Sequence, residues 1–245
     1  MLIALDSPLR KIPARLDRKQ TLFFDGVRYA AEMSHLAFTR LLKTLHALPE
    51  AEAGTAEYAD LVTAAMTDAW TIVDSTHRLR ELLAQFPKLK QKLPNLQVFY
   101  RATTGVETFR NVIQHLRGEI DKLAENGLPV WGSLTWRVQI DPATGEEAGF
   151  GVCAGTFYPG ASIYLSQFGD RLAEPIGRVC LNMGMVKLDL GELIRSIEPV
   201  IRFLEKGLAG QLPNEPHNAA DTLIQIIVKP IAGKPPGSTD QTPPP

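Results

Sequence analysis

The sequence predicts an α+β protein, in which an N-terminal antiparallel helical bundle is followed by an antiparallel β-sheet with a C-terminal helix. Apolar residues recur every three or four positions as far as residue 126, which is the period of a helix buried on one side. After Pro129 apolar and polar residues alternate, as in a strand, and short connections contain Gly and Pro. We therefore expect a bundle over residues 1–127, a sheet plus helix over 128–229, and a disordered Pro-rich tail over 230–245.

Two long helices open the predicted bundle. The first covers residues 17–48, and the second begins near Thr55 and is stopped by Pro87. The predicted inner face of the first helix consists of Phe23, Val27, Ala30, Met33, Ala37, Leu41, Leu45 and Leu48. Three long helices joined by short connections favour antiparallel packing.

The rest of the bundle is a basic connection and a third helix. Residues 88–102 contain Pro94 and are predicted to be a loop with a short turn. The third helix runs from about Thr104 to Asn126, where Gly127 provides a C-terminal stop.

Strand signals occupy most of the second half. We expect strands over 134–140 and 150–158 joined by a turn at 141–145, a third over 163–168 and a fourth over 178–188. Their short connections predict a meander. Asp189 is expected to cap a helix that ends near Leu208, and residues 223–228 form a further candidate strand.

Composition and charge narrow the functional classes. The formal net charge of the 245 residues is -1, but residues 77–117 hold eight basic and two acidic side chains. Such a local excess can attract phosphate, although a solvated basic face is the commoner explanation. Cys153 and Cys180 lack metal-ligand spacing, so free thiols are expected instead of a zinc site or a disulfide. The N-terminus lacks a signal-peptide pattern and no apolar run reaches membrane length, so the expected location is the cytoplasm.

The candidate chemistry lies on the third helix, where Arg110, Asn111 and His115 share its polar side. Asn111 and His115 are one turn apart, with Arg110 on the opposite flank of that side. A histidine can transfer a proton at neutral pH, and an arginine can stabilise the charge of a phosphorane. One such set offers one proton-transfer group, and a dimer would offer an acid and a base. This chemistry needs no metal and no cofactor. The residues expected to bind RNA beside it are Arg117, Arg78, Lys88 and Lys90.

Residues 17–126 resemble the HEPN superfamily, whose helical bundles carry an Arg, a polar residue that is often Asn, and a His four to six positions after the Arg. Catalytic members are metal-independent RNases that act as dimers, commonly as toxins or phage-defence effectors. The resemblance implies that Arg110 binds phosphate, His115 is the acid and base, and Asn111 supports them. It also implies RNA, a second copy and a cognate inhibitor as partners. The sheet does not belong to the core HEPN pattern.

Other readings of the same residues remain open. Arg110 can pair with Glu107 and His115 with Glu119, which would make this face ordinary helix surface. On the second helix Asp74 can pair with Arg78 and His77 with Glu81, and in an antiparallel bundle these residues can flank the polar face of the third helix. The alternative function is a non-catalytic module that dimerises or binds a partner. Binding of a nucleotide between bundle and sheet is a third hypothesis.

Overall fold

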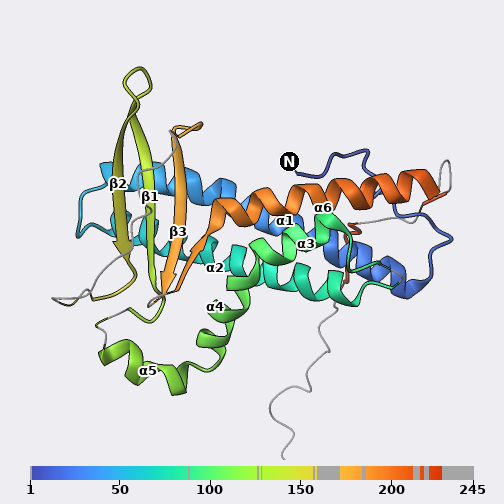
Figure 1. The fold of residues 1–245 in the computed structure, drawn as a ribbon, viewed down its shortest axis with the longest axis horizontal. Coiled ribbons are helices and arrows are strands. Elements are labelled where there is room, and N and C mark those ends of the chain that lie inside the picture. The colour runs from blue at the N-terminus through green and yellow to red at the C-terminus, as the bar shows by residue number, and fades with distance from the viewer. Residues whose placement is uncertain are drawn as a thin grey trace, which may run out of the picture.

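The computed structural model describes residues 2–87, 89–125, 127, 129–156, 158, 172–183, 186–211, 216–217 and 221–227. It has the predicted α+β architecture, with helices in the N-terminal half, a four-stranded antiparallel sheet and a C-terminal helix. In Figure 1 the sheet stands across one end of a long helical pair, and the last helix runs back along that pair.

The long pair consists of α1 (Arg18–Ala47) and α2 (Ala56–Gln85). Both begin where the sequence predicts, because Asp17 accepts a hydrogen bond from the Gln20 amide and Thr55 accepts one from the Tyr58 amide. Gln20 completes a capping box with Asp17. Between the two helices, η1 (Leu48–Glu50) tightens the chain reversal at Pro49.

Two predictions for the bundle are wrong. Residues 88–102 include the helix α3 (Pro94–Ala102), because Pro94 occupies the first turn, where a missing amide hydrogen has no cost. The single helix expected over 104–126 is divided at His115 into α4 (Thr104–Gln114) and α5 (Leu116–Glu125). His115 has φ −106° and ψ 25°, outside the helical region. Figure 1 shows α4 and α5 leaving the α1–α2 pair at an angle.

The described sheet has the order β2-β1-β3-β4 and comprises β1 (Ser133–Asp141), β2 (Glu146–Cys153), β3 (Ile176–Met183) and β4 (Val186–Asp189). All pairs are antiparallel, but β3 pairs with β1 and not with β2, so the predicted meander is wrong. The single strand expected over 178–188 is two paired strands. The strand expected over 163–168 and the tail from residue 230 lie outside the described residues.

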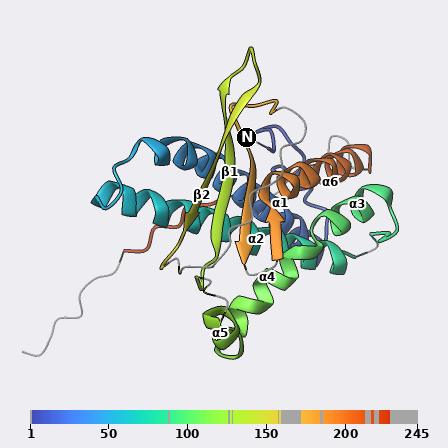
Figure 2. The same cartoon turned by 60° about the vertical axis from the view of Figure 1, so that its left-hand side comes forward.

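The last helix, α6 (Leu190–Gln211), starts as predicted, with Asp189 accepting a hydrogen bond from the Glu192 amide at 2.7 Å. Side chains of α6 enter both buried clusters. One joins the sheet to α1, α2 and α4, and the other joins α6 to α1, α2 and α3. The helical and sheet ranges therefore share their cores. In the rotated view of Figure 2 the strands cross the long helices.

Candidate functional site

Arg110 lies on the side of α4 that packs against α2. The neighbouring Phe109 is fully buried, and its ring centroid is 6.2 Å from that of Trp70 on α2. One and two turns farther along α2 come Asp74 and His77. The docking of Phe109 therefore directs the Arg110 guanidinium onto these two polar side chains.

The guanidinium of Arg110 hydrogen-bonds Nε2 of His77, and its Nε lies 3.7 Å from Oδ1 of Asp74. Oδ2 of Asp74 also accepts a hydrogen bond of 2.6 Å from Nε of Arg78. Asp74 thus joins two arginines, one from each helix. The predicted Asp74–Arg78 pair and the position of His77 beside the third predicted helix are confirmed. The predicted pairing of His77 with Glu81 is wrong, because His77 bonds Arg110, and so is the pairing of Arg110 with Glu107.

The contact with Arg110 favours the neutral form of His77. A guanidinium has only donors, so Nε2 must accept, and the ring is neutral with its proton on Nδ1. Nδ1 is buried and has no hydrogen-bond partner among the described residues. Burial lowers the pKa of His77 below its ordinary value of 6.5, and the positive charge of Arg110 lowers it further. With its lone pair engaged, the ring cannot accept a proton in this arrangement.

A groove of about 400 Å³ opens beside this cluster. Its polar end is formed by His77, Arg78 and Arg110, and its apolar wall includes Tyr29 and Met33 of α1. Arg110 keeps a third of its side chain exposed there. The groove therefore connects the charged cluster to the outer face of α1.

His115 lies apart from this cluster. It follows the last residue of α4, and its amide still donates to the Asn111 carbonyl at 2.9 Å, so the two residues remain one turn apart. Both side chains are exposed, and within the described part of the chain neither has a hydrogen bond. Among the described residues no hydrogen bond or ion pair joins His115 to Arg110. The guanidinium of Arg110 is instead bound to side chains of α2. The pairing of His115 with Glu119 is also wrong, because Glu119 binds Lys122 at 2.9 Å.

The residues expected to bind RNA are distributed over several elements. Arg78 belongs to the cluster on α2, Arg117 is exposed on α5, and Lys90 is exposed after α2. Lys88 lies outside the described residues.

One surface was not found from the sequence. The prediction placed Met33 on the inner face of the first helix, but its side chain is 48% exposed, together with Leu22, Tyr29 and Leu36. We call these four residues the α1 stripe. The seven-residue spacing of positions 22, 29 and 36 could have predicted this surface, because residues seven apart lie on one face of a helix. That face differs from the inner face of α1.

No family model, curated protein or solved structure matches the chain. Within the described ranges no group of three or more His, Cys, Asp or Glu side chains is arranged to hold a metal ion. Among the described helices, none has the length and apolar character needed to cross a membrane.

Proposed function

We propose that the protein is a non-catalytic module that forms a homodimer through the outer face of α1. One observation carries this proposal: the α1 stripe exposes four large apolar side chains by 46–63% on a helix whose other side is fully packed. Contiguous exposed apolar surface on a globular protein commonly marks an interaction site. Removal of such surface from water contributes about 25 cal/mol per Å² to the driving force, and the motional freedom lost on association offsets part of it.

The stripe has the symmetry that a two-fold interface requires. Leu22 and Leu36 each lie seven residues from Tyr29, on either side of it. In an antiparallel pairing of two α1 helices, Tyr29 would meet its own copy and Leu22 would meet Leu36. The same surface can therefore serve both subunits.

The charged cluster supports a role at the edge of this interface. Polar groups characteristically surround the apolar centre of a protein–protein interface. Arg110 and Arg78, which both pair with Asp74, lie at the polar end of the groove that Tyr29 and Met33 border. The engagement of Arg110 and His77 with each other also favours a structural role for them over proton transfer.

The test is the oligomeric state of the double variant Leu22→Asp/Leu36→Asp. Two unpaired carboxylates in the apolar centre should raise the dimer dissociation constant about a hundredfold or more. Size-exclusion chromatography with light scattering should give twice the chain mass for the parent protein and the mass of one chain for the variant.

The matched control is Ile140→Asp, which changes another apolar side chain, 59% exposed on β1, and should leave the dimer intact. A monomeric parent protein at tens of micromolar, or a double variant that dimerises as the parent does, would contradict the proposal.

The second candidate is metal-independent RNA cleavage, possible partners being RNA and a cognate inhibitor. It is favoured by the exposure of His115, whose ring has no hydrogen bond within the described residues, and by the exposed third of Arg110. In this candidate, dimerisation would supply the second proton-transfer group. Arg110 would have to leave His77 to bind phosphate.

A cytoplasmic location agrees with both candidates. Cys153 and Cys180 are free thiols, and burial raises the pKa of both, that of Cys180 to about 12. Inert, unpaired thiols are typical of proteins in a reducing compartment.

A further inference from the structure

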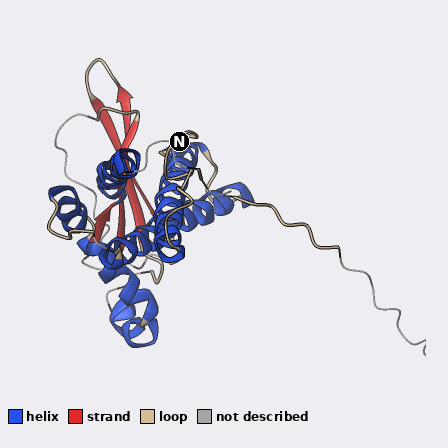
Figure 3. Cartoon of the chain, turned by 90° about the vertical axis from the view of Figure 1, so that its right-hand side faces the viewer, coloured by secondary structure: helices blue, strands red, loops and turns tan. Residues whose placement is uncertain are grey.

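An apolar arm leaves the protein next to the α1 stripe. Residues 222–227, which we call the arm, are extended, and Leu223, Ile224, Ile226 and Ile227 are 95%, 77%, 78% and 80% exposed. Figure 3 shows the described part of this segment running away from the helices. Four aliphatic side chains in six residues are costly to leave in water.

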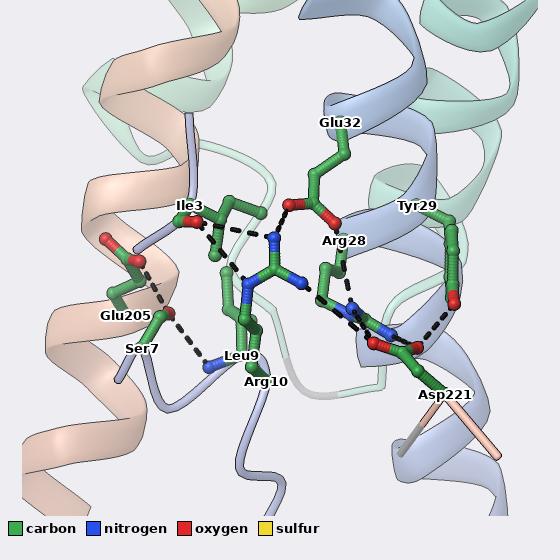
Figure 4. A network of polar contacts seen from close by, with 9 residues as sticks. All are labelled: Ile3, Ser7, Leu9, Arg10, Arg28, Tyr29, Glu32, Glu205 and Asp221. Atoms are coloured by element: carbon green, nitrogen blue, oxygen red, sulfur yellow. Dashed lines mark hydrogen bonds and ion pairs between the residues drawn. The ribbon is translucent and has the colours of Figure 1, made fainter. Parts of the chain in front are cut away.

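The root of the arm is fixed on α1. Asp221 accepts two hydrogen bonds from the buried guanidinium of Arg28, at 2.6 and 3.1 Å, and one from the Tyr29 hydroxyl (Figure 4). Arg10 lies 4.0 Å away and pairs with Glu32, which also lies near Arg28. The bonds from Arg28 and Tyr29 lower the pKa of Asp221 to about 2, so the anchor stays charged at any physiological pH.

The anchor places the arm at the centre of the proposed dimer. Tyr29, which binds Asp221, is the middle residue of the α1 stripe. A two-fold axis near Tyr29 would therefore bring the arms of both subunits together as they leave α1.

The arm has the composition of a β-strand, and its described backbone groups lack the hydrogen bonds that a strand would form. Ile and Leu dominate it, and it contains no Pro or Gly. Among the described residues no backbone hydrogen bond involves positions 222–227. An apolar surface that covers this segment must also supply backbone partners, because a buried unpaired amide is destabilising.

We propose that the arms of two copies pair with each other as antiparallel strands and close over the α1 stripes. This inference rests on the proposed dimer and adds the segment that completes its interface. The pairing is self-complementary about Gln225, since Leu223 then lies opposite Ile227 and Ile224 lies opposite Ile226.

The exposed apolar area is large enough for an interface with a second copy of the chain. The residues of the arm and the α1 stripe together expose on the order of 1,000 Å² per copy, so a dimer would bury at most about 2,000 Å², within the range of standard interfaces. The stripe alone would bury less than half of this, so pairing of the arms would add substantially to the interface.

Disulfide cross-linking of the full-length chain tests the pairing. In a Cys153→Ser background, Gln225→Cys places two thiols directly opposite each other at the two-fold axis, where Cβ atoms are about 5 Å apart. Oxidation should convert most of the dimer to a covalent dimer on a non-reducing gel. The matched control Ile140→Cys, also exposed, should cross-link at least tenfold more slowly.

A second variant, Ile226→Pro, removes one backbone donor and should slow the Gln225→Cys cross-link and raise the dimer dissociation constant about tenfold.

A stable dimer in which Gln225→Cys reacts no faster than Ile140→Cys would overturn arm pairing while leaving the dimer through α1 in place. Preferential cross-linking to a Thr67→Cys copy would overturn it too, by placing the arm in the apolar groove beside Trp70. A monomeric parent protein would remove both proposals.

Discussion

The neutral state of His77 follows from its neighbours on both helices. Burial is the main reason that the pKa of His77 is lowered, and the charge of Arg110 lowers it further. Glu81 and Asp74 act in the opposite direction, and Arg80 adds to the lowering. Burial of the ring beside Arg110 therefore disfavours a second proton on His77 and keeps the imidazole in its neutral form.

This arrangement predicts a pH-dependent stability. The folded-state pKa of His77 lies below the unfolded value of about 6.5, so below that pH the unfolded chain binds the proton more readily. Well above pH 6.5 the imidazole of His77 is neutral in both the folded and the unfolded chain and does not oppose folding. As the pH drops below 6.5 the unfolded chain takes up the proton first, so the free energy of unfolding should fall. Urea unfolding from pH 7.5 to pH 5 measures this slope.

His77→Gln should reduce the slope, leaving the part that comes from His35, whose pKa is also lowered by burial. His115→Gln changes an exposed ring without a hydrogen bond in the described chain, and should leave the slope as it is. An unchanged slope in His77→Gln would show that burial and Arg110 together do not lower the pKa of His77 in the folded protein.

At the scale of single elements, a close backbone contact fixes the start of β1. Gly132 has φ +79°, and a Cβ built on it would lie 2.3 Å from the Asn182 carbonyl oxygen of β3. Only glycine combines this left-handed conformation with so close an approach. The sheet can therefore follow α5 with a sharp turn directly before its central strand.

Gly132→Ala should destabilise the protein by roughly 3 kcal/mol, because the left-handed conformation and the clash with backbone both oppose the methyl group. The control is Gly54→Ala, where φ is +90° but no atom lies within 4 Å of the added Cβ. That variant should lose only the conformational part, about 1 kcal/mol. Equal losses in thermal or urea unfolding would show that the contact with Asn182 is unimportant.

At the scale of the whole molecule, bundle and sheet form one packed unit. Phe109 of α4, Leu134 of β1 and Leu193 of α6 belong to the same buried cluster. The position of α4 is therefore set by the sheet as well as by α2, and Arg110 is held with it. A change that loosens the sheet should also disturb the charged cluster.

The RNase candidate is tested on the intact protein. If it cleaves, labelled RNA should be cut in the presence of EDTA, since the mechanism needs no metal, and His115→Ala should reduce the rate at least a hundredfold. Circular dichroism should show an unchanged fold, because His115 is exposed. His46→Ala, on α1, serves as the matched control. Full cleavage by His115→Ala would eliminate this mechanism.

Much of the secondary structure could be predicted because its signals are local. Asp17, Thr55 and Asp189 cap helices within three residues of themselves, and the turn at 141–145 joins two alternating segments. The helix break at His115 and the helix after Pro94 were missed, because the apolar spacing continues through the first and a proline normally interrupts a helix.

The sequence alone determined the α+β class, the long helices and the antiparallel strands, since period and capping depend on neighbours along the chain. Tertiary structure decided which polar side chains meet: Arg110 and His77 are 33 positions apart, and Arg28 and Asp221 are 193 apart. It also turned Met33 outward and left the arm uncovered. Such contacts depend on how the elements pack, because a side chain finds a distant partner only after the cores have placed its helix.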